Sequence, residues 1–154
     1  MRLVSHVSIG VRDIERSLHF YRDLLGMEVI MDRSRSLGKI DGIYSDDKEH
    51  FRREIFLRWH GNEDIDNVFI SISTPEGQSD RKPLRFEDLG IHHVGFWVDD
   101  LEARMDRLRK AGCKVVYYGE SDGEEFAENK AHRVVSAIVE DPDGTLLQFD
   151  QRFT

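Results

Sequence analysis

Hydrophobic and polar positions alternate from residue 4 to residue 11, with Val7, Ile9 and Val11 on one side and His6 on the other. A period of two predicts a β-strand with one buried face. The apolar spacing then changes to three and four, which predicts a helix whose buried stripe contains Ile14, Leu18, Tyr21 and Leu25. Asp13 is placed to cap the start of this helix and Gly26 to end it.

The same order of elements is predicted twice. Strands at 27–31, 53–60 and 67–73 follow the first helix. A strand at 92–98, a helix at 99–112 and strands at 113–118, 132–139 and 145–151 follow in the second half, with Leu101, Met105 and Leu108 on the helix stripe and Gly112 as its stop. Each half therefore has the order β-α-β-β-β.

The two halves share one offset. His6 and His93 lie 87 positions apart, and so do Asp13 and Asp100, which open the two helices. A shared offset predicts an internal repeat. We divide the chain into a first module at 1–76, a linker rich in Pro, Gly and charge at 77–89, and a second module at 90–154.

Charge and composition narrow the range of partners. The formal net charge is −8, which argues against nucleic acid or an anionic membrane as a partner because both need a positive surface. No apolar run is long enough to span a bilayer, and the start of the chain lacks the apolar region of a signal peptide. The single cysteine, Cys113, cannot form an internal disulfide. We therefore expect a cytoplasmic protein with a small-molecule substrate.

Three stretches resemble the vicinal oxygen chelate superfamily: "HVSIGVRDIERSLHFYRDLLGMEV", "IHHVGFWVDDLEARMDRLRKAG" and "VEDPDGTLLQF". That superfamily includes glyoxalase I, methylmalonyl-CoA epimerase, the fosfomycin-resistance enzymes, bleomycin-binding proteins and the extradiol ring-cleaving dioxygenases. The resemblance implies an α+β fold of two βαβββ modules. Their mixed sheets would form an open, barrel-like cup with the helices outside and the site inside. Short members of the superfamily pair, so it also implies a homodimer.

The resemblance further implies metal ligands on the first and last strands of each module. The first-strand positions fall on His6 and His93, whereas strand alternation places His92 on the opposite face. The last-strand position of the second module falls on Gln148, and that of the first falls on Ser71. Glyoxalase-like members carry Glu or Gln at the Ser71 position and Glu at the Gln148 position. We therefore take His6, His93 and Gln148 as the ligand set, with Ser71 beside a vacant or water-filled position.

Two imidazoles suit Fe, Zn, Mn, Ni or Co, and an amide oxygen makes the ligand set neutral. The glutamate that moves a proton in glyoxalase-like enzymes is missing. His132 is the first candidate acid–base group, and Asp150 is an alternative because it shares the face of Gln148. Asn67 occupies the place of an assisting histidine in the dioxygenases, and the rings of Phe69 and Trp97 are expected to line the cup.

Two functions fit these residues. The first is a metal-dependent enzyme that binds a small oxygen-rich or aromatic metabolite through two neighbouring oxygens, as a dioxygenase or as a lyase or isomerase. The second is a metal-free protein that sequesters a drug or metabolite. The segments at 33–52 and 119–132 are longer than the repeat needs, and we interpret them as binding loops, lids or solvated surface loops.

Overall fold

The computed structural model describes residues 4–36, 49–59, 68–75, 80, 82–122 and 133–153. The chain divides into two compact units, Met1–Asp80 and Arg81–Thr154. Each unit is described by itself below. The module boundaries at 1–76, 77–89 and 90–154 stay a prediction.

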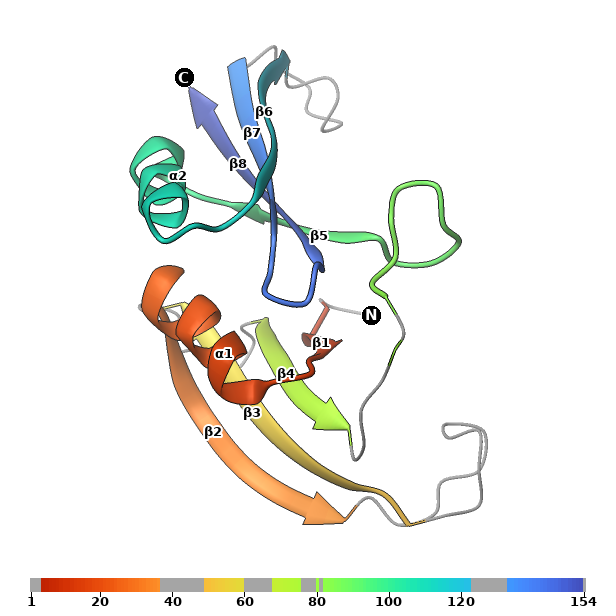
Figure 1. Cartoon of the computed structure of the whole chain (residues 1–154). Helices are drawn as coiled ribbons and strands as arrows, with labels where there is room; N and C mark the ends of the chain where they lie inside the picture. Colours follow the sequence, from red (N-terminus) through yellow and green to blue (C-terminus); the bar gives the residue numbers. More distant parts are fainter. Residues whose placement is uncertain are drawn as a thin grey trace. The chain divides into compact units, whose positions relative to one another are not determined.

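The first unit is a four-stranded mixed sheet with a helical segment against it (Figure 1). Its elements are β1 (His6–Gly10), α1 (Ile14–Leu18), the π-helix η1 (His19–Leu24), β2 (Met27–Ser36), β3 (Phe51–Trp59) and β4 (Phe69–Pro75). The strand order is β1-β4-β3-β2, with β1 parallel to β4 and the other pairs antiparallel.

The second unit repeats this topology. Its elements are β5 (His93–Trp97), α2 (Leu101–Lys110), β6 (Val115–Asp122), β7 (Arg133–Glu140) and β8 (Leu146–Phe153). The strand order is β5-β8-β7-β6, and again only the first and last strands run parallel. The predicted α+β fold of two βαβββ modules is confirmed. Among the described residues, no helix has the length and apolar character needed to cross a membrane.

One face of each sheet forms the core under its helix. Helix α1 contacts β4, and α2 contacts β6, β7 and β8. The largest fully buried side chains of the two cores are Tyr21, Leu25, Ile55, Leu57 and Ile72 in the first unit, and Leu101, Met105, Leu108, Leu147 and Phe149 in the second. The apolar stripes predicted for both helices are buried, apart from the half-buried Ile14.

The two helical segments are bounded by the capping residues that the sequence predicts. The Asp13 carboxylate accepts the backbone N–H groups of Glu15 and Arg16, each at 3.0 Å. The Asp100 carboxylate accepts the backbone N–H of Ala103 at 3.1 Å. Gly26 and Gly112 have positive φ angles of 79° and 78°, a conformation that ends a helix at low cost only for glycine.

Three elements differ from the predicted ones. The first helix is α-helical only to Leu18 and then continues as a π-helix, with the Leu25 N–H bonded to the Phe20 carbonyl. Strand β2 extends to Ser36 because its ladder with β3 continues to the pair Ser36–Phe51. Strand β6 likewise extends to Asp122, so both predicted long loops are partly strand.

Candidate functional site

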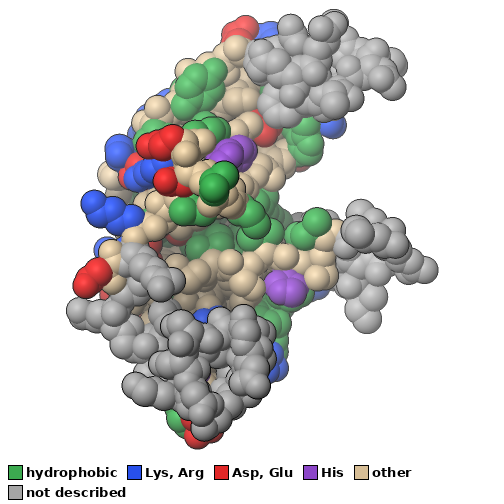
Figure 2. Space-filling view, turned by 90° about the vertical axis from the view of Figure 1, so that its right-hand side faces the viewer, with side chains coloured by type: hydrophobic (Ala, Val, Ile, Leu, Met, Phe, Trp, Pro, Cys, Tyr) green, Lys and Arg blue, Asp and Glu red, His purple; other side chains and the backbone are tan. Residues whose placement is uncertain are grey.

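The face of each sheet opposite its helix carries a histidine at the first residue of the first strand. We call this the histidine face of each unit. In the first unit it contains His6, in register with Phe69, and Ser71, in register with Ser8 and Phe56. In the second unit it contains His93, with Gln148 in register with Gly95. Histidine side chains reach the molecular surface beside hydrophobic ones (Figure 2).

Stacked rings cross the histidine face of the first unit. The His6 ring stacks on Phe69 with centroids 5.0 Å apart and an interplanar angle of 10°. Phe69 stacks in turn on Phe56 at 4.6 Å, and the Arg33 guanidinium lies 5.5 Å from the Phe56 centroid. The Ser5 hydroxyl lies 3.0 Å from His6 Nδ1. The rings cover one another's faces, and the exposed His6 ring at the end of the row is suited to stacking on an aromatic ligand.

A buried carboxylate lies on the same face. Glu54 is 8% exposed and is bonded to Arg35 Nε at 2.9 Å and Arg33 Nη2 at 3.2 Å. The hydrogen bond from Arg35 lowers the pKa of Glu54 below its ordinary value, against the opposing effect of burial. The two arginines therefore compensate the charge of this carboxylate. Ser71 is buried on the neighbouring strand at 4% exposure.

In the second unit, His93 belongs to a cluster of three rings. His93 Nδ1 and His92 Nδ1 lie 2.7 Å apart, so one of the two nitrogens carries the hydrogen and donates a hydrogen bond to the other. The Phe86 ring contacts both imidazoles, at 4.6 Å from His92 and 5.0 Å from His93. Burial lowers the pKa of His93, the neighbouring His92 adds to this effect, and Asp150 opposes it.

The contact between the two imidazoles contradicts the expectation that strand alternation holds His92 apart from His93. The reason is that β5 begins at His93. His92 precedes the strand, so the pleat does not fix the direction of its side chain.

Gln148 and Asp150 form a hydrogen-bonded pair on β8. Gln148 Nε2 donates to the two oxygens of the Asp150 carboxylate at 3.0 and 3.2 Å. Ser136 on β7 donates its hydroxyl to Asp150 Oδ1 at 2.5 Å. Asp150 is 5% exposed, and a Cβ atom added at Gly95 would lie 3.7 Å from Asp150 Oδ2.

Trp97 occupies the end of β5, in register with Asp150. Its side chain is 47% exposed, and the Arg152 guanidinium lies 3.7 Å from its ring centroid. One face of the ring is therefore covered by a cation.

The three predicted ligands share a pattern of hydrogen bonds. The Nδ1 atoms of His6 and His93 are bonded to Ser5 and His92, and the amide nitrogen of Gln148 is bonded to Asp150. The two Nε2 atoms and Gln148 Oε1 form no hydrogen bond within the described part of the chain. In the tautomers whose Nδ1–H groups donate these hydrogen bonds, both Nε2 atoms carry a lone pair, and together with Gln148 Oε1 they are donor types that a borderline divalent ion accepts.

Two predicted site residues have no described position, and one residue that contacts the site was not predicted. His132 and Asn67, the candidate acid–base residue and a candidate wall residue, lie outside the described residues. Within the described ranges, no three His, Cys, Asp or Glu side chains gather into a metal-binding group. Sequence analysis missed Ser136, although a lone polar residue in the apolar run "RVVSAIV" is a signal for a buried hydrogen bond.

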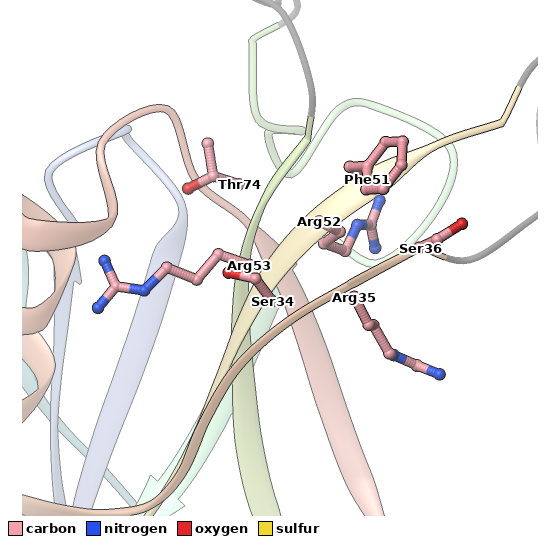
Figure 3. A pocket seen from close by; sticks show the side chains of 7 residues that line it. All are labelled: Ser34, Arg35, Ser36, Phe51, Arg52, Arg53 and Thr74. Atoms are coloured by element: carbon pink, nitrogen blue, oxygen red, sulfur yellow. The ribbon is translucent and has the colours of Figure 1, made fainter.

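A cavity of about 450 Å³ lies at the ends of β2, β3 and β4 in the first unit (Figure 3). It contains none of the predicted site residues, and its lining consists of Ser34, Arg35, Ser36, Phe51, Arg52, Arg53 and Thr74. Arg53 is already paired with Asp32 at 2.7 Å and Glu15 at 2.6 Å. Arg35 is bound to Glu54, so two of the three arginines lining this cavity are engaged by carboxylates of the chain itself.

Residues 5–133 match the family model described as Glyoxalase/Bleomycin resistance protein/Dioxygenase superfamily. The chain belongs to this superfamily. An ethylmalonyl-CoA/methylmalonyl-CoA epimerase of Cereibacter sphaeroides is 30% identical over 124 residues, which cover 76% of each chain. A probable lactoylglutathione lyase of Synechocystis is 29% identical over 147 residues, covering 95% of this chain and 92% of the relative.

Solved structures of glyoxalase-family proteins share the fold. A glyoxalase family protein from Bacillus cereus superposes with a TM-score of 0.74 at 18% identity, covering 100% of this chain and 95% of that one. The trypanothione-dependent glyoxalase I of Leishmania major gives a TM-score of 0.64 at 22% identity, covering 97% of this chain and 86% of that one. These likenesses identify the fold, whereas the activity depends on the residues of the site.

Proposed function

We propose that this glyoxalase-superfamily protein is a metal-dependent enzyme whose ligands are His6, His93 and Gln148. The observation that carries the proposal is the hydrogen-bond pattern of these three residues. In each, a neighbour binds one polar atom, and the atom that would coordinate a metal has no hydrogen-bond partner among the described residues. The ion is one of Fe, Zn, Mn, Ni or Co, which accept imidazole nitrogen together with an oxygen ligand.

A divalent ion with open positions polarises a carbonyl and stabilises the negative charge that develops on its oxygen. We propose that the substrate is a small metabolite with two neighbouring oxygens. The relatives named as epimerase and lyase favour an isomerase or lyase reaction over oxygen-dependent ring cleavage. His132 is the proposed acid–base group for the proton transfer that such a reaction requires.

The walls of the site orient the substrate in this proposal. The stacked rings of Phe69 and His6 would lie against a planar or aromatic part of the substrate. Trp97, Ser71 and Asn67 are the other proposed contacts. We further propose that the protein acts as a homodimer, which light scattering on the purified protein will test.

Metal uptake tests the proposal. Protein purified without chelators is incubated with Zn(II), Mn(II), Ni(II), Co(II) or anaerobic Fe(II), desalted, and analysed for bound metal. We expect the wild-type protein to retain about one ion per chain for at least one of these metals, and we expect His93→Ala to retain none. His19→Ala is the matched control, because His19 is exposed on the helix and bonded to Asp23. Wild-type protein that retains none of these ions would overturn the proposal.

Two assays then separate the reaction types. Isomerisation of hydroxy-ketones by the metal-loaded protein is the expected result. Oxygen consumption with catechols would instead indicate a dioxygenase.

The row of rings supports a second candidate function. His6 stacks in parallel on Phe69, and such a platform is also suited to a protein that binds an aromatic ligand without a metal. In that case the protein retains no divalent ion, and an aromatic compound quenches tryptophan fluorescence equally well with and without chelator. Quenching that requires the metal excludes this function.

A further inference from the structure

We propose that Asp150 is a positioning residue that keeps the Gln148 amide oxygen turned away from its own carboxylate and available to a metal, and that its charge is the reason position 148 carries an amide. The inference rests on the proposed function. It gives Asp150 a structural and electrostatic task in place of the acid–base task expected from sequence.

The chemistry of the pair fixes the direction of the amide. A carboxylate only accepts hydrogen bonds, and the amide of Gln148 donates only through Nε2. Nε2 lies 3.0 and 3.2 Å from the two oxygens of Asp150. The opposite orientation would place Oε1 against a negative charge. The side chain therefore keeps Oε1 turned away from Asp150 and free for a ligand.

The carboxylate is itself held in place. Ser136 donates a hydroxyl hydrogen bond to it from the neighbouring strand at 2.5 Å, and the register pairs these two residues directly. Asp150 is 5% exposed, so water competes little for its oxygens. A ligand anchored through a buried partner is preorganised, which lowers the cost of binding the ion.

The same distances explain the departure from the family pattern at position 148. A glutamate there would bring a second carboxylate to about the same 3.0 Å distance from Asp150. Two negative charges at this distance in a buried environment repel each other strongly. With glutamine, the negative charge lies one hydrogen bond behind the ligand. It still favours a cation, and it occupies no coordination position.

A double-mutant cycle on positions 148 and 150 tests this inference. The probe is Co(II), whose visible absorption reports coordination geometry, with Zn(II) affinity measured by competition against a chromophoric chelator. Asp150→Ala is expected to weaken metal binding by roughly 10–100-fold, the usual effect of losing the partner of a ligand. Asp150→Asn keeps an oxygen that accepts from Gln148 but lacks the charge, so it is expected to weaken binding less.

The decisive variant is Gln148→Glu combined with Asp150→Asn. Asp150→Asn is expected to weaken binding when residue 148 is glutamine and to strengthen it when residue 148 is glutamate. This reversal of sign is the signature of two coupled charges, and a purely structural role of Asp150 does not produce it. Far-UV circular dichroism and the melting temperature of each apo variant show that the comparison is made between folded proteins.

The outcomes distinguish a failure of the proposed function from a failure of the role proposed for Asp150. Wild-type protein that binds neither Co(II) nor Zn(II) overturns the proposed function and this inference with it. Wild-type protein that binds metal, while Asp150→Asn shifts affinity in the same direction in both backgrounds or not at all, overturns this inference alone. A second readout needs no metal. The side-chain amide protons of Gln148 should exchange slowly in wild type and fast in Asp150→Ala, and equal exchange contradicts the orientation we propose.

Discussion

The two histidine faces place a carboxylate and a serine at corresponding positions, but in exchanged order. In the first unit the carboxylate is Glu54 on β3, in register with Ser73 on β4. In the second the carboxylate is Asp150 on β8, in register with Ser136 on β7. The repeat thus conserves a polar pair on the last two strands, while the strand that carries the charge differs.

The surroundings of the two carboxylates differ more than their positions. Glu54 is bound by two guanidinium groups, so its charge is neutralised within the unit. Asp150 is bound by a hydroxyl and an amide, and it forms no ion pair with a Lys or Arg side chain among the described residues. The comparison teaches that the first unit uses its carboxylate to hold strands together. In our proposal the second unit uses its carboxylate to act on a ligand.

The largest effect on metal affinity is expected at His6 and His93, the histidines that begin the first strand of each face. His6→Ala and His93→Ala should each lower Zn(II) affinity by more than the roughly 10–100-fold that follows the loss of a ligand's partner, because each removes a ligand itself. Competition with a chromophoric chelator measures the affinity, and His19→Ala should leave it unchanged. If only one of the two variants loses affinity, the faces do not contribute equivalent ligands.

Removing the charge of Glu54 should affect stability and not metal binding. Glu54→Gln removes the buried negative charge that Arg33 and Arg35 bind and one of its acceptor oxygens, and it is expected to lower the free energy of unfolding by about 1–3 kcal/mol. Urea denaturation measures the change. Glu15→Gln is the matched control, because Glu15 also pairs with an arginine but is exposed, so its loss should cost less than about 1 kcal/mol. Equal losses in the two variants would contradict a special role for the buried carboxylate.

The two helix caps provide a comparison of the units in which the expected loss of stability is smaller. Asp13→Ala removes two hydrogen bonds to backbone N–H groups, and Asp100→Ala removes one. Each is expected to cost about 1 kcal/mol of stability, with the greater loss for Asp13. Thermal unfolding followed by circular dichroism measures both, and a greater loss for Asp100 would be the contrary result.

The pH dependence of stability gives the smallest signal. The pKa of Glu54 is lowered in the folded protein, so its contribution is complete above the ordinary pKa of about 4.5 and is lost as the pH falls through the lower folded value. Wild type should therefore lose more stability between pH 6 and about pH 3 than Glu54→Gln does. Asp23, Asp32, Glu120 and Glu140 also have lowered pKa values, so a residual slope is expected in the variant. Identical slopes would exclude the contribution of Glu54.

Periodicity and capping predicted most of the fold. The alternation around Ile9 and the helical spacing of Leu101, Met105 and Leu108 determine which faces are buried, and these side chains are buried in the structure. Local rules could specify them because each depends on residues close together in the sequence. The extension of β2 to Ser36 escaped prediction, since it depends on pairing with a strand 15 residues away at Phe51.

The candidate site divides along the same line. Alternation and the shared offset predicted that His6 and His93 open corresponding strands, whereas Gln148 was assigned as a ligand through the resemblance to the superfamily. The bond between Ser136 and Asp150 depends on the register of β7 against β8, which no local pattern fixes. The contact of Phe86 with His93 depends on the path of the segment before β5, where hydrophobic periodicity carries no information.

The pair on β8 also constrains how such a site changes through evolution. Glutamine and glutamate codons differ by one base, and so do those of aspartate and asparagine. Exchanging Gln148 first would pass through an intermediate with two facing acids about 3.0 Å apart, whereas exchanging Asp150 first would not. A lineage moving from the amide form to the acid form of this site therefore has a preferred order of mutations, with the residue behind the ligand changing before the ligand does, and in the reverse direction the ligand changes first.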